Sequence, residues 1–258
     1  MKLKNALNWF RRLSVGLTRG ERLTYFLIQL LLILVGTILA LTHKTLLVAV
    51  GAGIIATGAA GLLTFARSVL QEEQSERIRI LTRFGILSAF ERRGAMIRIQ
   101  YDERLSGARR GIDVIGFGLK HLQEDYRSSF NQWADACPVR ILLIDPEAPM
   151  RATDSYASAR DGEEGLATGT IAGEVKDFLE KTAHLRVTRP DRFQVRLYHS
   201  LPSFNLFRVD DTLFYGPYLL EQQSRNTPTL LLGRGILYDA LMSHFEELWS
   251  DRHSRAAP

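Results

Sequence analysis

The chain has 258 residues, of which 46% are apolar and 24% are charged, a composition compatible with one ordinary domain or two small ones. Its net charge of +5 is unevenly distributed: residues 1–66 hold seven Lys/Arg and one acid, whereas residues 67–258 hold 26 basic and 27 acidic residues. A nucleic-acid-binding domain needs basic side chains clustered on its folded surface, so no nucleic-acid partner is expected. The single cysteine, Cys137, excludes an internal disulfide and a thiolate zinc site, and it fits a reducing compartment.

Residues 1–22 form a basic segment that we expect to be cytoplasmic. Within it, Leu7–Leu17 mixes apolar side chains with Arg11 and Arg12. This mixture fits a short helix lying on an anionic membrane surface, and it equally fits a frayed basic tail.

Residues 23–66 predict a transmembrane helical hairpin. Leu23–Thr42 is a run of 20 residues without a formal charge, which as a helix spans about 30 Å, the thickness of a bilayer core. Thr45–Ala66 is a second such run, and only His43 and Lys44 separate the two. A signal peptide is excluded because the first run is too long and a second span follows it directly.

The charges that flank the two spans predict their orientation. Basic residues precede the first span and follow the second, whereas Lys44 is the one Lys/Arg residue at the tip. The positive-inside rule therefore places both termini in the cytoplasm, and in a bacterium the membrane is the inner, cytoplasmic one. Neither span contains Asp, Glu, Lys or Arg, so no ion site or proton relay of a transporter is expected.

The second span carries small residues at intervals of four, which allow helix backbones to approach closely. These residues lie on two neighbouring stripes: Ala52, Ala56 and Ala60, and Gly53, Thr57 and Gly61. One interpretation is that they pack on the first span within the hairpin. The other, which we favour, is that they pair with another copy and form a homo-oligomer in the lipid bilayer.

Residues 67–110 predict a stalk helix and linker, and residues 111–250 predict an α/β domain. In the second region strand-like runs alternate with helical patterns, which favours a mixed, mostly parallel sheet covered by helices. The runs are Ile112–Phe117, Val139–Ile144, Phe193–Tyr198, a hairpin of Asn205–Val209 with Leu213–Tyr215, and Thr229–Leu232. Helical spacing marks Leu119–Trp133, Ile171–Leu179 and Leu237–Trp249, and Met150–Gly169 predicts a long loop.

The sequence holds no strong cofactor or metal motif. Gly116-Phe117-Gly118 follows a strand, but position 121 is His where a dinucleotide fingerprint has its third glycine, so we expect a tight strand-to-helix turn with Lys120 available to an anion. The six histidines have no metal-ligand spacing. We therefore expect no cofactor and no metal.

Residues 198–232 read YHSLPSFNLFRVDDTLFYGPYLLEQQSRNTPTLLL. They resemble the catalytic half of the phospholipase D superfamily, in which a strand carries His-x-Lys, then four residues, Asp, and a Gly-Ser turn. With Asp210 as the family's Asp, Ser203 stands at the position of its His, Asn205 at the position of its Lys, and Gly216-Pro217 one residue before Gly-Ser. The resemblance extends over residues 111–249 and implies a phospholipase-D-like domain.

The departures from the family pattern imply that the domain has lost its catalytic residues. In the family the His forms a covalent phosphoryl intermediate and the Lys holds the phosphate, and Ser with Asn cannot do both. Active relatives also combine two halves, whereas this chain has one. The remaining catalytic candidates are His199, which is either a substitute base or a loop histidine beside Pro202, and Asp210.

Neutral donors and guanidinium groups near the strand ends suit recognition of a phosphate without its cleavage. The candidate ligand-binding residues are Lys120, Ser203, Asn205, Arg208, Tyr218, Ser224, Arg225, Asn226 and Thr227. The alternative to ligand binding is a purely structural role. Residues 226–228 would then form a turn before a strand, and Arg208 would lie on the solvent face of a hairpin.

Together these features predict a membrane-anchored sensor or effector. Its degenerate cytoplasmic domain would bind a phosphate-containing ligand, such as a nucleotide signal, and control oligomerisation of the hairpins. Clustered hairpins that disrupt the membrane would fit bacterial antiviral defence. The alternative is a membrane-tethered phosphodiesterase or phospholipase that uses His199 and Asp210 across a dimer.

Overall fold

The computed structural model describes residues 19–42, 44–92, 95–150, 154–200 and 203–258. The chain divides into two compact units, Met1–Ile80 and Leu81–Pro258. The predicted basic segment lies outside the described residues up to position 18, and so does the choice between a surface helix and a frayed tail for Leu7–Leu17.

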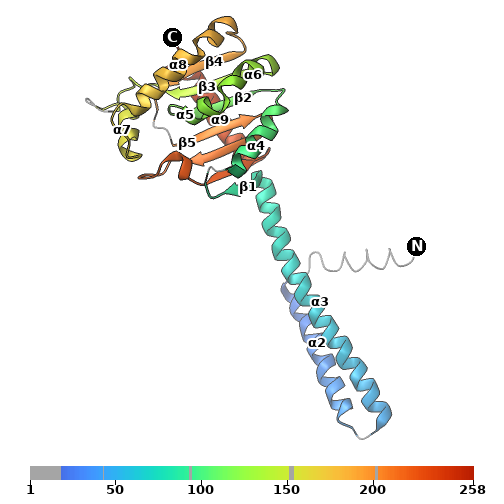
Figure 1. The fold of residues 1–258 in the computed structure, drawn as a ribbon. Coiled ribbons are helices and arrows are strands. Elements are labelled where there is room, and N and C mark those ends of the chain that lie inside the picture. Colours follow the sequence, from blue (N-terminus) through green and yellow to red (C-terminus); the bar gives the residue numbers. More distant parts are fainter. Residues whose placement is uncertain (1–18, 43, 93–94, 151–153, 201–202) are drawn as a thin grey trace. The chain divides into compact units, whose positions relative to one another are not determined.

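The first unit is a pair of helices, α2 (Arg19–Ala40) and the N-terminal part of α3 (Thr45–Phe84), shown in blue and cyan in Figure 1. Both helices are long and apolar enough to cross a membrane. Glycines let them approach closely, because a Cβ atom on Gly51 would lie 2.6 Å from the carbonyl oxygen of Gly36. Tyr25 stacks on Phe65 with ring centroids 5.7 Å apart, and an ion pair joins Arg22 to Glu72.

The small residues of α3 lie mainly outside this helix contact. Gly61 faces the side chain of Gln29, but Ala52, Gly53, Ala56, Thr57 and Ala60 are exposed. The interpretation that both stripes pack on the first span is therefore wrong for these five residues. The contact with α2 instead uses Gly51 and Gly58, which are buried on a different face of α3 from these five residues.

The second unit contains an eight-stranded sheet with the order β1-β7-β6-β5-β2-β3-β4-β8 among the described residues (Figure 1). The strands are β1 (Ile86–Phe90), β2 (Ile112–Gly116), β3 (Val139–Ile144), β4 (Phe193–Tyr198), β5 (Phe204–Val209), β6 (Thr212–Pro217), β7 (Thr229–Leu232) and β8 (Arg255–Ala256).

The fold is α/β with a mixed sheet, but the expectation of a mostly parallel sheet is wrong. Only β2–β3 and β3–β4 are parallel pairs in the described sheet, and the other five neighbouring pairs are antiparallel. Parallel neighbours need a long crossover, and the helical segments after β2 and β3 supply it for these two pairs. The turn of Asp210 and Asp211 joins β5 to β6 directly, which forces an antiparallel pair.

Helices cover both faces of the sheet. They are α4 (Ala95–Ser106), α5 (Lys120–Tyr126), α6 (Phe130–Ala136), α7 (Tyr156–Glu163), α8 (Thr170–Thr188) and α9 (Ile236–Ser250), with short 3-10 turns at Arg127–Ser129 and Ser224–Asn226. On one face Phe130 of α6 contacts both Phe178 of α8 and Phe193 of β4. On the other face α9 packs its Phe245 and Trp249 under Arg140 of β3.

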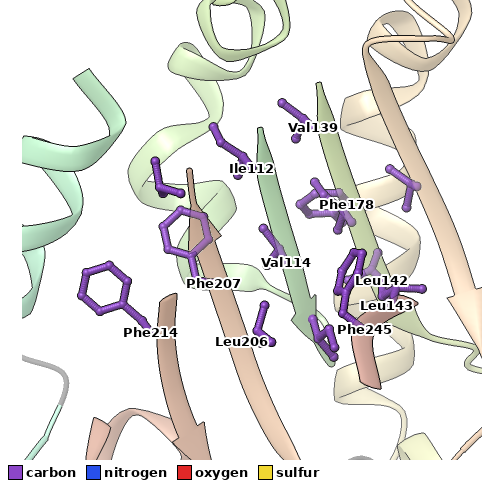
Figure 2. Packing of buried hydrophobic residues seen from close by; sticks show 14 of the residues in the cluster. Ile112, Val114, Val139, Leu142, Leu143, Phe178, Leu206, Phe207, Phe214 and Phe245 are labelled. Carbon is purple, nitrogen blue, oxygen red and sulfur yellow. The ribbon is translucent and has the colours of Figure 1, made fainter. Parts of the chain in front are cut away.

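The core lies between these layers and is continuous through the sheet. Figure 2 shows Ile112, Val114, Val139 and Leu142 on neighbouring central strands, with Phe178 and Phe245 brought in from helices. All six side chains are nearly inaccessible to solvent. Burial of this kind stabilises a domain by about 25 cal/mol per Å² of apolar surface removed from water, which fixes the strand ends that carry the candidate site.

Residues 81–110 belong to this domain and not to the predicted stalk and linker. The helix continues only to Phe84, and Gly85 then adopts a left-handed conformation with φ of 81° that ends it. The following residues form β1, which pairs with β7, and α4, whose Ile97 is 2% exposed. Two further predictions are corrected: the expected loop over 150–169 contains α7, and the expected single helix over 119–133 is split between α5 and α6.

We expect Gly85→Ala to lower the free energy of unfolding by about 2 kcal/mol or more, because an L-residue is strained at this φ. In addition, the new Cβ would lie 2.4 Å from the carbonyl oxygen of Gly233. The matched control is Gly173→Ala in α8, where no atom lies within 4 Å of the added methyl and a gain of about 0.5–1 kcal/mol is expected. Urea denaturation of the full-length protein measures both; equal effects of the two substitutions would contradict the role of Gly85.

Candidate functional site

The carboxyl ends of the parallel strands meet at one edge of the sheet. The register pairs Ile144 with Tyr198, so the residues that follow β3 and β4, Asp145 and His199, emerge side by side. The antiparallel hairpin of β5 and β6 adds the start of β5 and the end of β6 to the same sheet, with Phe204 opposite Pro217. Ligand-binding groups gather at such strand ends in α/β sheets, so this edge is the candidate site.

A buried carboxylate organises one part of this edge. Asp145 is 1% exposed, and its Oδ2 lies 2.7 Å from Nε2 of His199 and 2.6 Å from Nε of Arg255. Its Oδ1 accepts from the backbone N–H of Glu147 at 3.0 Å and from Nη2 of Arg255 at 3.1 Å. The carboxylate therefore holds the imidazole of His199 in one orientation, with about a third of that side chain exposed to solvent.

The same contacts determine the protonation state of Asp145. Burial alone would raise the pKa of this carboxyl group. The hydrogen bonds from Arg255, from the backbone of Glu147 and from His199 outweigh the burial, so the pKa lies below its usual value. Asp145 is therefore ionised at neutral pH.

Ser203, Asn205 and Tyr218 are brought together on the β5–β6 hairpin. The backbone N–H of Tyr218 donates to the carbonyl oxygen of Ser203 at 2.9 Å, and Asn205 pairs with Gly216 one step along the ladder. The side-chain amide of the buried Asn205 donates to the carbonyl oxygen of Gly216 at 2.9 Å. The hydroxyl of Thr229, which is 0% exposed, lies beside Gly216 and has no hydrogen-bond partner among the described residues.

Arg160 of α7 connects Tyr218 to the loop before β7. Its guanidinium lies 4.8 Å from the ring centroid of Tyr218 and 5.3 Å from that of Phe117, and it pairs with Glu164 at 2.7 Å. Glu164 also accepts from the backbone N–H of Ser224 at 3.3 Å. Because Arg160 is only 3% exposed, it holds this side of the site together and its charge is already paired.

Arg208 and Asp210 lie at the opposite end of β5 from Ser203. Arg208 pairs with the buried Asp113, which also pairs with Arg140, and donates to the carbonyl oxygen of Asp210. Asp210 occupies the β5–β6 turn with φ of 52°, where its carboxylate accepts from the backbone N–H groups of residues 109–111 at 2.7–3.2 Å. The structure therefore gives both residues internal roles and separates them from the other candidates.

The remaining candidates are more peripheral. Lys120 is exposed at the start of α5, near Glu174, whose pKa is raised because burial outweighs the attraction of Lys120 and His121. The Gly116-Phe117-Gly118 turn is tight, as predicted, with φ of 54° at Leu119. The other four candidates lie in the turn before β7, where Thr227 is buried and donates to the carbonyl oxygen of Ser224, whereas Arg225 and Asn226 are exposed.

A small cavity opens at the same edge, between the start of β5 and α9. It has a volume of about 10 Å³, roughly the space of one oxygen atom, and is lined by Ile115, Tyr198, Ser200, Ser203, Phe204, His244 and Leu248. At the described residues, the structure contains no cluster of His, Cys, Asp and Glu that could hold a metal ion.

Sequence reasoning missed four residues of this edge: Asp145, Tyr198, Arg160 and Arg255. The position of Asp145 directly after a predicted strand was a usable signal, because strand ends gather functional groups. Tyr198 was recognised only as the last residue of a strand. Arg160 and Arg255 carry no local signal, since α7 was expected as a loop and β8 has only two residues.

Comparisons with known proteins give one match to a family model. The model described as "Domain of unknown function (DUF5919)" matches residues 83–255, which is 173 of the 258 residues. No curated protein matches the sequence.

Similar solved structures include TrmBL2, an archaeal chromatin protein that binds DNA. It is 11% identical with a TM-score of 0.44, over 78% of this chain and 69% of that one. They also include a phosphatidylserine synthase of Haemophilus influenzae Rd KW20, which is 12% identical with a TM-score of 0.39, over 65% of this chain and 38% of that one. Both are weak structural neighbours, and neither assigns a function to this chain.

We expect Asp210→Ala to lower the free energy of unfolding by about 2 kcal/mol or more, because the N–H groups of residues 109–111 lose their acceptor. Asp211→Ala is the matched control: among the described residues, the Asp211 carboxylate forms ion pairs with Arg110 and Arg234, and such surface pairs contribute under about 1 kcal/mol. Thermal unfolding of the full-length variants measures the difference. Asp210→Ala with wild-type stability would contradict the structural role and return Asp210 to the catalytic candidates.

Proposed function

This chain belongs to the DUF5919 family, and we propose that it is a membrane-anchored sensor or effector. In this proposal a phospholipase-D-like domain without the catalytic His and Lys binds a phosphate-containing ligand, such as a nucleotide signal, and does not cleave it. Ligand binding controls oligomerisation of the two-helix membrane hairpins.

The observation that carries the proposal is the β5–β6 hairpin. Asp210 occupies its tight turn, and Ser203, Asn205 and Gly216 lie together at its other end. This arrangement supports the register of the phospholipase D resemblance, in which the residues that contact phosphate occupy one end of the hairpin. Ser203 and Asn205 then stand where the nucleophile and the phosphate-binding cation of an active enzyme would be.

The chemistry of these positions favours binding over cleavage. Asn205 is neutral and buried, and its amide is bonded to the backbone of Gly216. A serine hydroxyl becomes a nucleophile only when a base accepts its proton, and the Nε2 atom of His199 lies 2.7 Å from the carboxylate of Asp145. Hydroxyl and amide donors can still recognise a phosphate oxygen without the release of a leaving group.

The exposed face of α3 supports oligomerisation. Ala52, Ala56, Ala59, Leu63, Ala66 and Leu70 recur at alternating intervals of four and three residues, and all six are exposed. Such a repeat keeps one seam of a helix against a partner along its length, and small residues bring the backbones close. A second copy of α3 is the partner that this repeat fits.

The charge distribution supports a topology with both termini in the cytoplasm and the hairpin in the inner membrane of a bacterium. The ligand-binding domain would then monitor the cytoplasm. Clustering of the hairpins into a membrane-disrupting assembly would make the protein an effector of growth arrest or antiviral defence. This last step rests only on the exposed face of α3.

The alternative function is a membrane-tethered phosphodiesterase or phospholipase. The observation that favours it is the contact of His199 with Asp145, which orients the imidazole as general bases are oriented in hydrolases. The partner of His199 is Asp145, and Asp210 does not take part. Arg255 also pairs with Asp145, so His199 shares this carboxylate with a guanidinium group.

We expect AMP and cyclic di-AMP to stabilise the purified full-length protein in a thermal-shift measurement, because a ligand that binds only the folded state adds about 2.7 kcal/mol at 100 times its dissociation constant. His199→Ala should retain this stabilisation. Cleavage of bis-p-nitrophenyl phosphate by the wild type, lost in His199→Ala, would favour the enzyme instead. The absence of any shift with either nucleotide would overturn nucleotide sensing.

We expect Ala56→Leu to weaken self-association about ten-fold, because the larger side chain separates the helix backbones at the seam. Val50→Leu is the control: Val50 is exposed and apolar, but it lies outside the repeat. Light scattering of detergent-solubilised protein measures the oligomer. A monomeric wild type, or equal effects of the two substitutions, would argue against α3 as the interface.

A further inference from the structure

The hydroxyl group of Tyr198 is one of the buried polar atoms of the α/β domain that lack a hydrogen-bond partner among the described residues. The side chain is 0% exposed, and its oxygen has no hydrogen-bond partner among the described residues. Burial raises the pKa of Tyr198 well above its usual value, so the hydroxyl stays protonated and is a donor at neutral pH. A buried hydroxyl without a partner is costly, and native structures rarely retain one without a reason.

Tyr198 lines the cavity of about 10 Å³ described above. The other polar side chains of its lining are Ser200, Ser203 and His244, of which Ser203 and His244 are exposed. The cavity is therefore lined both by the fully buried Tyr198 and by residues that reach the surface. The volume admits one oxygen atom and is too small for a larger group.

We propose that this cavity is an oxygen socket, in which the Tyr198 hydroxyl donates to one non-bridging oxygen of a ligand phosphate while the rest of the ligand lies at the rim. The inference deepens the proposed function and rests on it, since it names the group that contacts the ligand. It adds a residue that the resemblance to phospholipase D does not supply, because Tyr198 belongs to β4 and not to the β5–β6 hairpin.

The surroundings favour a phosphate oxygen over an apolar group. Hydroxyl and imidazole side chains are among the residues that line the space, and a phosphate oxygen is a stronger acceptor than a neutral one. Residues 67–258 have a net charge of −1, so no broad positive field attracts the ligand and individually placed donors must do so. His244 is held at the rim by its contact with Phe204, at a centroid distance of 5.3 Å.

The test is Tyr198→Phe in the full-length protein, with Tyr238→Phe as the matched control. Both tyrosines are buried, but the Tyr238 hydroxyl donates to the carbonyl oxygen of Asp210 at 3.1 Å. Without ligand, Tyr198→Phe should melt at the wild-type temperature or about 2–4 °C above it, because an unpaired polar atom is removed. Tyr238→Phe should melt lower, because it loses a satisfied hydrogen bond.

Isothermal titration calorimetry then measures binding of inorganic phosphate, AMP and dihexanoyl phosphatidic acid to each protein. Tyr198→Phe should bind at least about ten-fold more weakly than the wild type to every probe that the wild type binds, whereas Tyr238→Phe should bind like the wild type. A preference of the wild type for AMP over the lipid identifies a soluble ligand, and the reverse preference identifies a lipid headgroup; either supports a phosphate socket.

Two results would overturn the socket alone. The first is wild-type affinity for the probes in Tyr198→Phe. The second is a loss of thermal stability in Tyr198→Phe as large as that in Tyr238→Phe. Such a loss would mean that the Tyr198 hydroxyl already has a hydrogen-bond partner, for example a water molecule. Failure of the wild type to bind any of the three probes would overturn the proposed function together with the socket.

Discussion

One carboxylate joins the two parts of the sheet on which the candidate site depends. Asp210 accepts hydrogen bonds from the backbone of residues 109–111, the segment that leads into β2, while its own backbone forms the β5–β6 turn. This fixes β5 against β2, with Val209 opposite Ile112. In the sheet, β3 and β4 follow β2 on the side away from β5. The position of this turn therefore determines which hairpin residues reach the sheet edge that holds Asp145 and His199. Asp210 is the residue on which the resemblance to phospholipase D is aligned. In the structure its carboxylate has a role in stabilising the fold, as the acceptor for these backbone N–H groups.

Two buried aspartates lie at opposite ends of the parallel strands and have different consequences. Asp113 is enclosed by Arg140 and Arg208, so both guanidinium groups are paired within the domain. Breaking one partner of such a buried pair leaves an uncompensated charge, which makes this end structural. Asp145 is also paired, but with His199 and Arg255, whose side chains reach solvent. The edge of the sheet at Asp145 is therefore the one where a ligand can exchange contacts with charged groups.

Sequence patterns predicted the strands better than they predicted their order. The runs Val139–Ile144, Phe193–Tyr198 and Thr229–Leu232 match β3, β4 and β7 residue for residue, because each is a short segment whose apolar residues are continuous or alternate with polar ones. The end of α3 was missed because Ile80–Phe90 keeps apolar residues at helical spacing, and only the conformation of Gly85 stops the helix. Of the site, the hairpin residues were predicted from a motif. Tyr198 and Arg255 were not, because their roles depend on contacts with segments distant in sequence, which no local pattern contains.

The uneven charge distribution of the chain limits how the second unit could bind an anion. The positive surplus lies in residues 1–66, so any anion that bound the second unit would be attracted by few groups. Most of its arginines near the sheet are already committed: Arg160 to Glu164, Arg208 to Asp113 and Arg255 to Asp145. The polar groups without a partner at the candidate edge are instead hydroxyls, those of Tyr198 and Thr229, among the described residues. Recognition by hydroxyl groups is directional and short-ranged, so a ligand that binds here would be selected by the placement of its oxygens rather than by its total charge.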